Sequence, residues 1–530
     1  MKSFYQKIKV PLWIILSGFL TSLPLVITQL GFLQWIAIIP VAIMLIRSAE
    51  SDIKLRKLYG RGVLFFAVYY AVSFHWFFYM YPLDFAGLSN AASIAVVLIA
   101  CFGLGLFQAV QSALMFLLFG LVSRTDAVKN NKIVMPFLAA SLWVVIEWWQ
   151  TVGWWGVPWG RLPLGQMSFS LLVRSSALFG SYFVTFIIVA VNFCLALVID
   201  RKSIKLIGVA LAISLFCFNL ALGAVVTVTY KNDGEAVKAA AIQGNIPSSE
   251  KWDINSKSKV VAIYKELTEK AAAEGAELVV WPETALPYVL SESQSLTEFV
   301  TDLAKDNNIT LIVSVFTVDE ETDARYNSIL EVKPDGSFGE TVYSKQRLVP
   351  FGEFVPMREF VTFIFPPLAN VGMLEDDLLA GDSSEVIDSE IGKIGCGICF
   401  DSIYENLMIE STGNGAEVLV VSTNDSWFSD SAALDMHNSQ SRLRAIENGR
   451  YLVRAANTGI SSVIDPLGNV NGKLGALERG YVVEEITLHD KFTLYSSIGN
   501  LFVYLCMAFY AGLLAFSLCQ KGNIKFIKKS

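Results

Sequence analysis

The chain has 530 residues, enough for several domains, and 54% of them are hydrophobic, which is high for a soluble protein. Its formal net charge is −7, but residues 230–494 hold 42 of the 48 acidic residues and only 21 of the 41 basic ones. So acidic a segment excludes nucleic-acid binding, because phosphate contacts need clustered Lys and Arg. We therefore expect no nucleic-acid partner.

Residues 1–229 contain only six acidic residues and several apolar runs of about 18 residues or more, the length that crosses a bilayer as a helix. This composition predicts a membrane domain of about seven transmembrane helices. An eighth span is expected within 495–530, ahead of a basic tail. The predicted spans are 11–28, 31–46, 62–82, 93–121, 134–150, 171–199, 206–228 and 497–519.

The basic residues alternate between the loops that connect these spans. If the N-terminus is cytoplasmic, the inside segments hold 18 Lys and Arg residues and the short outside loops hold essentially Arg161. This pattern predicts cytoplasmic termini and places residues 230–494 on the opposite side. It is typical of a multi-pass protein of the bacterial inner membrane, whose outer side is the periplasm.

Residues 230–494 alternate predicted strands with predicted helices and hairpins. This alternation predicts an α/β or α+β layered domain, in which helices cover a sheet. The predicted strands are 278–281, 309–318 and 393–400, and a strand that leads into a loop is predicted over 237–246 and over 416–428. The predicted helices are 256–275, 296–308 and about 432–456, and the hairpins are 327–348 and 459–470.

Three polar residues fall where predicted strands end, and chemistry in such sheets tends to occur there. Glu283 follows the strand 278–281, Lys345 lies in the second arm of a hairpin, and Cys399 ends a strand. A thiol can be activated by a carboxylate that takes its proton, with a lysine that holds developing negative charge. Each residue alone has an ordinary structural explanation, and only their combination indicates a cysteine nucleophile.

Cys396 and Cys399 stand three apart in "GCGIC". A zinc site needs about four Cys or His ligands, and the chain has only three histidines, so we expect no metal and no cofactor. A redox pair usually begins a helix, whereas residues three apart in a strand point to opposite faces. We therefore expect Cys399 to react and Cys396 to pack. A cysteine–histidine dyad would require the fold to bring His437 close.

Several motifs resemble the nitrilase superfamily, and in particular the apolipoprotein N-acyltransferase family. They are "WPETALP", "YSKQRLVPFGEFVP", "GCGICFDSIYENL", "QGNIPSSEKW", "STNDSWF" and "RAIENGRYLVRAANTG". The likeness covers nearly the whole chain. It implies a membrane domain (1–229), a nitrilase-like α-β-β-α sandwich, the carbon-nitrogen hydrolase domain (230–494), and a final helix with a basic tail (495–530).

The resemblance also implies roles for the three strand-end residues. Cys399 would attack the ester carbonyl of a phospholipid and hold the acyl chain as a thioester. Glu283 would act as general base, and Lys345 would stabilise the oxyanion with the backbone N–H that follows Cys399. The acyl chain would then pass to the α-amino group of an N-terminal diacylglyceryl-cysteine, which completes bacterial lipoprotein maturation.

Further positions match the family less directly. Glu353 resembles its second essential glutamate, and Trp252 and Trp427 match its substrate-loop tryptophans. The family often has Tyr-Glu directly after the nucleophile, where this chain has Phe400 and Asp401. We keep both as site positions, although Phe400 lacks the hydroxyl of tyrosine and Asp401 is one methylene shorter than glutamate.

The implied partners are a phosphatidylethanolamine-like donor, a diacylated apolipoprotein acceptor and the bilayer, and we expect a monomer. One alternative is a membrane-tethered amidase or nitrile hydrolase that uses the same triad with water. Another is a degenerate nitrilase fold that only binds partners, against which the intact Glu/Lys/Cys set argues. The apolar segment 363–374 fits either core or an arm that dips into the bilayer.

Overall fold

The computed structural model describes residues 2–83, 89–200, 204–251, 253–319, 321–364 and 377–527. The chain divides into two compact units. One is helical and comprises Met1–Phe78, Val96–Thr229 and Ile498–Ser530. The other comprises Tyr79–Ala95 and Tyr230–Ser497 and contains the sheets. It includes all three residues predicted to be catalytic, Glu283, Lys345 and Cys399, and for that reason we call it the catalytic unit.

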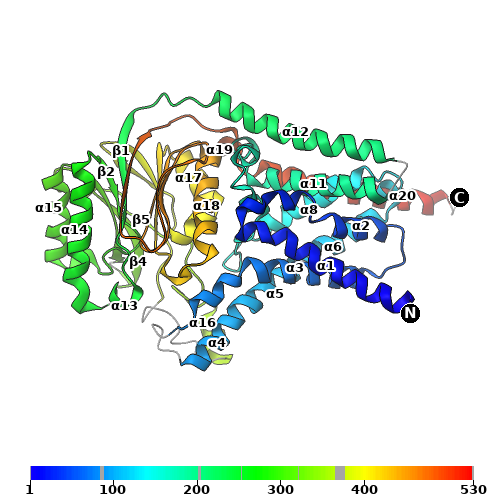
Figure 1. The fold of residues 1–530 in the computed structure, drawn as a ribbon, viewed down its shortest axis with the longest axis horizontal. Coiled ribbons are helices and arrows are strands. Elements are labelled where there is room, and N and C mark those ends of the chain that lie inside the picture. The colour runs from blue at the N-terminus through cyan, green and yellow to red at the C-terminus, as the bar shows by residue number, and fades with distance from the viewer. Residues whose placement is uncertain are drawn as a thin grey trace. The chain divides into compact units, whose positions relative to one another are not determined.

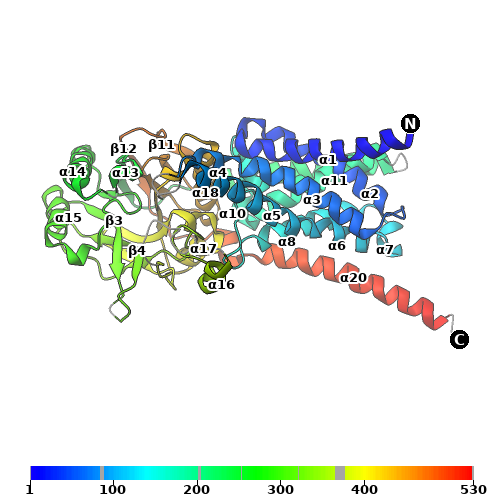
Figure 2. The ribbon, with the colours of Figure 1, turned by 90° about the horizontal axis from the view of Figure 1, so that it is seen from below.

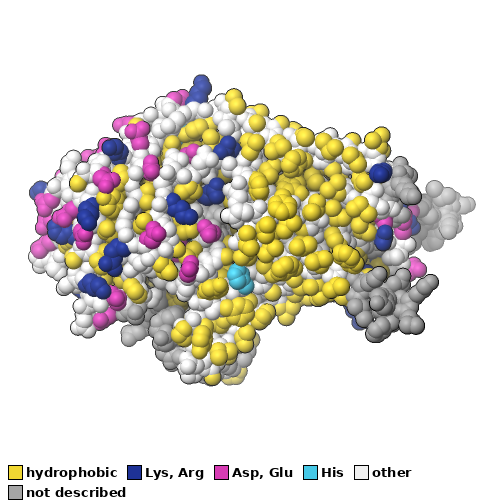
Figure 3. All heavy atoms as spheres, viewed as in Figure 1, with side chains coloured by type: hydrophobic (Ala, Val, Ile, Leu, Met, Phe, Trp, Pro, Cys, Tyr) yellow, Lys and Arg dark blue, Asp and Glu magenta, His cyan; other side chains and the backbone are white. Residues whose placement is uncertain are grey.

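The helical unit is built from long apolar helices (Figures 1 and 2). They include α1 (Lys2–Val26), α2 (Ile39–Ser48), α3 (Leu55–Ser73), α5 (Leu104–Ser112), α6 (Leu114–Ser123), α8 (Val134–Trp149), α11 (Ser181–Asp200), α12 (Lys205–Thr229) and α20 (Leu501–Ile527). Figure 3 shows hydrophobic side chains spread over the outside of these helices, as lipid contact requires. This unit therefore fits a membrane domain.

Among the described residues, five helical segments are long and apolar enough to cross a membrane. They are Thr28–Ser48, Asn90–Ser123, Ser181–Asp200, Lys205–Thr229 and Leu501–Cys519. Three shorter apolar helices are Val10–Val26, Val134–Trp149 and Ser170–Phe179. The expected number of eight spans stays a prediction.

The catalytic unit contains two six-stranded sheets. The first has the order β12 (Gly480–Thr487), β1 (Ala236–Gln243), β2 (Leu278–Val280), β3 (Thr310–Val318), β4 (Arg325–Val332) and β5 (Tyr343–Ser344). The second has the order β11 (Val470–Leu474), β10 (Ser461–Ile464), β9 (Leu452–Ala456), β8 (Val418–Thr423), β7 (Gly392–Ile398) and β6 (Val386–Ser389).

Alternating side chains of these strands form three apolar layers. In β1, Ala239 and Ala241 face the second sheet, whereas Ala240 and Ile242 face α14 (Lys257–Ala273) and α15 (Gln294–Asn307). On the second sheet, strand residues pack against α17 (Glu405–Gly413) and α18 (Ala432–Asn448). Figure 1 shows these helices on the outer faces. The predicted α-β-β-α sandwich is confirmed.

The parallel direction of neighbouring strands places their carboxyl ends at the same edge of each sheet. Strands β1, β2 and β3 run parallel, as do β7, β8 and β9. The residues that follow β2, β7 and β8 therefore emerge at one edge of each sheet, which is the usual place for a site in parallel sheets. The Ser422 hydroxyl of β8 donates to the Trp281 carbonyl at 2.8 Å and ties these edges together.

The predicted helix 432–456 is wrong in its last third. Helix α18 ends at Asn448, and Gly449 follows it with a φ of 63°, in the left-handed conformation that often ends helices. Residues 452–456 form the buried strand β9, between β8 and β10. The sequence also gave no expectation of β12, which pairs antiparallel with β1.

Candidate active site

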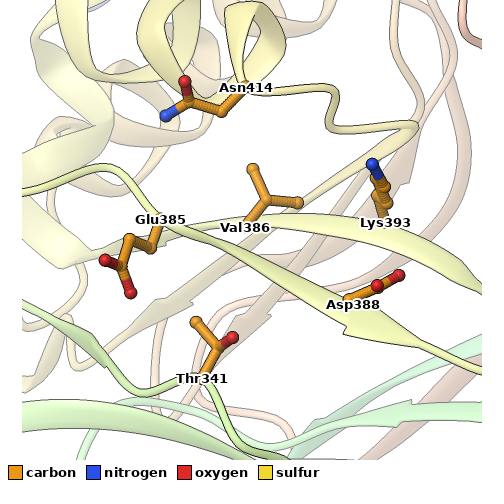
Figure 4. A pocket seen from close by; sticks show the side chains of 6 residues that line it. All are labelled: Thr341, Glu385, Val386, Asp388, Lys393 and Asn414. Carbon is orange, nitrogen blue, oxygen red and sulfur yellow. The ribbon is translucent and has the colours of Figure 1, made fainter.

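Each of the three predicted catalytic residues follows a strand. Glu283 lies three residues beyond β2, Lys345 comes directly after β5, and Cys399 directly after β7. An open hollow of about 470 Å³ lies elsewhere on the catalytic unit (Figure 4). It is lined by Thr341, Glu385, Val386, Asp388, Lys393 and Asn414 and includes none of the predicted site residues. The hollow thus offers no alternative set of the predicted catalytic residues, and the candidate site lies at the strand ends that carry Glu283, Lys345 and Cys399.

The carboxylate of Glu283 is buried and fully hydrogen-bonded. Its Oε1 accepts from Lys345 Nζ and from Asn327 Nδ2, both at 2.9 Å, and its Oε2 accepts from the Asn424 N–H at 2.8 Å. All three donors favour the ionised form. Glu283 is thus held in one orientation as a carboxylate.

The ammonium of Lys345 bridges two carboxylates. It lies 2.9 Å from Glu283 Oε1 and 2.7 Å from Glu353 Oε1, and its side chain is 1% exposed. The other oxygen of Glu353 accepts from the Val349 N–H at 2.8 Å. The structure therefore brings Glu353, the predicted supporting residue, into direct contact with the lysine.

Burial and charge act in opposite directions on this trio. Burial alone would raise the pKa of Glu283, but Lys345, Lys251 and the Asn424 N–H hold the pKa below its usual value. Burial would lower the pKa of Lys345, but Glu283 and Glu353 raise it well above its usual value. Burial raises the pKa of Glu353 despite the opposing effect of Lys345. Of the two carboxylates, Glu283 is thus the one that its surroundings hold in the ionised form, which a general base requires.

Cys399 is half-buried and lies at a bend of the chain. Its φ is 49°, which for a residue with a side chain costs roughly 1–3 kcal/mol. Burial and the charge of Glu283 raise the pKa of its thiol, while Lys345 lowers it. The resting group is thus a neutral thiol that needs a base to become a nucleophile.

The two residues after Cys399 behave differently from each other. The ring of Phe400 packs edge-on against Tyr404 at 5.4 Å. Asp401 is fully buried and accepts from the Ile398 N–H at 3.0 Å, the Arg347 N–H at 2.7 Å and the Tyr343 hydroxyl at 2.9 Å. These contacts stabilise the turn, and burial raises the pKa of Asp401 to about 6.

The structure describes only one of the two predicted tryptophans. Trp252 lies outside the described residues. Trp427 lies half-buried in the short 3₁₀ helix Ser426–Phe428, on the loop that also carries Asn424. Most of the apolar segment 363–374 also lies outside the described residues.

Sequence reasoning missed three residues that hold Glu283. Two are Asn327 and Asn424, which donate to its carboxylate. The third is Lys251, a buried lysine whose Nζ donates to the Glu283 carbonyl at 2.8 Å. Burial lowers its pKa to about 8. Lys251 and Asn424 both stand within motifs that carry the family resemblance, "QGNIPSSEKW" and "STNDSWF", and those positions were the available signal.

The fold also brings His437 to the nucleophile. A ring nitrogen of His437, a carboxylate oxygen of Asp425 and the Cys399 sulfur lie within 4.8 Å of one another. The Asp425 carboxylate already binds the guanidinium of Arg454 at 2.7 Å, a charge that opposes a metal ion there.

Comparison with known proteins agrees with this geometry. The family model of the carbon-nitrogen hydrolases matches residues 238–491, and that of the apolipoprotein N-acyltransferase N-terminal domain matches residues 17–194. The apolipoprotein N-acyltransferase of Gloeobacter violaceus is 31% identical over 483 residues, which are 91% of this chain and 89% of that one. The chain belongs to the apolipoprotein N-acyltransferase family.

Other relatives extend the comparison. The apolipoprotein N-acyltransferase of Geobacter metallireducens is 29% identical over 518 residues, 96% of this chain and 95% of that one. The structure of Nit3 from Saccharomyces cerevisiae, a nitrilase-superfamily member, covers 49% of this chain and 92% of that one at 21% identity, with a TM-score of 0.39. The family predicted from the sequence is confirmed, and the protein is a membrane N-acyltransferase of the carbon-nitrogen hydrolase superfamily.

Proposed function

We propose that this enzyme moves an acyl chain from a phospholipid, through a thioester on Cys399, to the N-terminal diacylglyceryl-cysteine of apolipoproteins. The observation that carries the proposal is the Glu283–Lys345 ion pair beside the Cys399 thiol. It supplies a base, a cation and a nucleophile, the parts that acyl transfer through a covalent intermediate requires. The names of the curated relatives support apolipoproteins as the acceptor.

In the first half-reaction, Glu283 takes the thiol proton while the sulfur attacks the ester carbonyl of the donor. The carbonyl electron pair moves to oxygen, and this oxyanion is stabilised by Lys345 Nζ and the Phe400 N–H. Collapse of the intermediate breaks the ester C–O bond. Glu283 returns its proton to the alkoxide, and the lyso-phospholipid leaves.

In the second half-reaction, the neutral α-amino group of the acceptor attacks the thioester carbonyl. Glu283 takes a proton from the amine, and the same two donors stabilise the second oxyanion. The C–S bond then breaks, and Glu283 returns the proton to the departing sulfur. Glu353 keeps Lys345 in place through both steps, because its carboxylate binds the same ammonium that Glu283 binds.

The setting follows from charge and hydropathy. The Lys and Arg distribution supports cytoplasmic termini and a catalytic unit in the periplasm of the inner membrane. A phosphatidylethanolamine-like lipid is the donor that such a membrane supplies. One chain provides Glu283, Lys345 and Cys399, so the site needs no second copy, which supports a monomer.

The decisive experiment is intact-mass analysis of the whole protein after incubation with phosphatidylethanolamine. We expect an added acyl mass on Cys399 that hydroxylamine removes and that Cys399→Ala lacks. Addition of a diacylated lipopeptide should discharge the adduct and give triacylated product.

Two results would contradict the proposal. Acylation of the lipopeptide without any adduct on Cys399 would exclude the thioester route. Discharge to free fatty acid at the same rate with and without lipopeptide would favour the membrane-tethered amidase, in which water is the acceptor.

A further inference from the structure

The main-chain carbonyl of Cys399 is held by two side chains. The hydroxyl of Ser402 donates to it at 2.7 Å, and Nε2 of His437, on α18, lies 3.1 Å from it. The Ser402 hydroxyl also lies 3.0 Å from Nε2. A carbonyl oxygen only accepts hydrogen bonds, so a hydrogen bond between Nε2 and the Cys399 carbonyl requires a proton on Nε2. His437 therefore contacts the backbone of the nucleophile.

The other ring nitrogen, Nδ1, is held by the carboxylate of Asp425. Nδ1 of His437 lies 2.9 Å from Asp425 Oδ1, which also accepts from Thr423. The second oxygen of Asp425 accepts from Arg454 Nη2 at 2.7 Å. The side chains of His437, Asp425 and Arg454 are at most 1% exposed. The ring is thus clamped in one orientation.

These contacts define the protons of the ring. Asp425 is ionised, because Arg454 and His437 hold its pKa low despite burial. An ionised carboxylate only accepts hydrogen bonds, so Asp425 favours a proton on Nδ1, whereas burial and the charge of Arg454 lower the pKa of His437. The fold does bring His437 close to Cys399, as a cysteine–histidine dyad would require. The contact that Nε2 makes there, however, is with the carbonyl of Cys399 and the hydroxyl of Ser402.

The carbonyl of Cys399 and the N–H of Phe400 belong to the same peptide group. In a trans peptide these two bonds point in opposite directions within one plane. Fixing the carbonyl toward His437 and Ser402 therefore fixes the N–H toward the other side. Among the described residues, none accepts a hydrogen bond from the Phe400 N–H, so this donor is open to a ligand.

We propose that His437 is a positioning residue, which holds the Cys399 carbonyl and thereby aims the Phe400 N–H at the oxyanion. The inference rests on the proposed thioester chemistry. Asp425 and Arg454 contribute indirectly, because Asp425 orients the His437 ring and Arg454 holds Asp425.

The test compares two substitutions of similar size in the whole protein. His437→Gln keeps an N–H donor near the position of Nε2, and His437→Met does not. Each variant is measured in two reactions of Cys399. Acylation by p-nitrophenyl butyrate passes through an oxyanion, whereas alkylation by iodoacetamide displaces iodide at a saturated carbon and forms none.

We expect His437→Met to slow acylation about 100-fold, the order seen when one oxyanion donor is lost. Alkylation should stay within about threefold of the wild-type rate, and His437→Gln should recover most of the lost acylation. Equal loss of acylation and alkylation would overturn the inference, because it would mean that the thiol itself was disturbed. So would wild-type acylation in His437→Met, or a His437→Gln variant no faster than His437→Met.

Because p-nitrophenyl butyrate is not a phospholipid, it tests the role of His437 independently of the proposed phospholipid donor. If the wild-type protein is acylated by p-nitrophenyl butyrate but never by phosphatidylethanolamine, the proposed donor is wrong and the role of His437 is still tested. If phosphatidylethanolamine acylates all three proteins equally, the proposed function stands and the role of His437 fails.

Discussion

Asp401 accepts a hydrogen bond from the main-chain N–H of Arg347 at 2.7 Å. This contact joins the turn that carries Cys399 in the second sheet to the segment that carries Lys345 in the first. The Tyr343 hydroxyl and the Ile398 N–H complete the set of donors around the same carboxylate. The distance between nucleophile and lysine thus depends on a residue that contacts neither.

The first prediction concerns this carboxylate. Asp401→Asn keeps the shape of the side chain but replaces one carboxylate oxygen, which accepts hydrogen bonds, by an NH2 group, which donates them. This NH2 group then faces a donor, either a main-chain N–H or the Tyr343 hydroxyl, and a buried hydrogen bond is lost. We expect the free energy of unfolding to fall by about 2 kcal/mol, the cost of an unmade buried hydrogen bond. Thermal unfolding in detergent measures this loss. Asp388→Asn, at an exposed carboxylate, is the matched control, and equal stability of the two variants would contradict the prediction.

The second prediction concerns the cation between Glu283 and Glu353. Lys345→Met leaves two buried carboxylates side by side without a counter-charge, and we expect stability to fall by about 3–5 kcal/mol. Adding Glu353→Gln removes one of the two charges, so the double variant should regain part of the stability but none of the acyl transfer. Chemical denaturation and thioester formation are the two measurements. Recovery of transfer in the double variant would show that Lys345 only balances charge.

The third prediction separates the two cysteines. Cys396 is fully buried in the core between the sheets, so Cys396→Ala should cost about 1 kcal/mol of stability and leave acyl transfer within about twofold. Cys399→Ala should abolish the acyl adduct. Mass spectrometry and thermal unfolding of both variants give the comparison. A Cys396→Ala variant that folds but forms no adduct would contradict the single-nucleophile interpretation.

The fourth prediction uses pH. Lys251 lowers the pKa of Glu283, so Lys251→Met should raise that pKa. Alkylation of Cys399 needs ionised Glu283 and therefore falls on the acid side of its pH profile. This acid limb should move to higher pH in Lys251→Met. Lys259→Met, at an exposed lysine, should leave the limb in place, and coincident profiles for the two variants would refute the coupling.

The sequence allowed the layered fold and the triad to be predicted for a physical reason. Buried strands are short apolar runs, and the polar residues that follow them are visible without any knowledge of the fold. Glu283, Lys345 and Cys399 all stand at such positions. Local pattern was misleading at 452–456, where strand β9 follows a helical pattern after only three residues, 449–451, the first of which is the left-handed Gly449.

The residues that surround the triad could not be predicted from strand ends. His437 stands 38 residues from Cys399, and its importance arises from the packing of α18 against the turn after β7. Asn327 and Lys251 reach Glu283 from 44 and 32 residues away. A single asparagine or lysine has no pattern that marks it, so contacts of this kind appear only when strand order and register are known.

The pairing of β1 with β12 has an evolutionary consequence. Ala236 and Thr487, near the two ends of the catalytic unit, are direct neighbours across an antiparallel ladder. In topological terms, residues 230–497 thus occupy the place of one loop between α12 and α20, while Tyr79–Ala95 joins the same unit from within the helical part of the chain. Gain or loss of such an insertion would leave the order of the flanking helices intact, but it would also change the surroundings of Tyr79–Ala95.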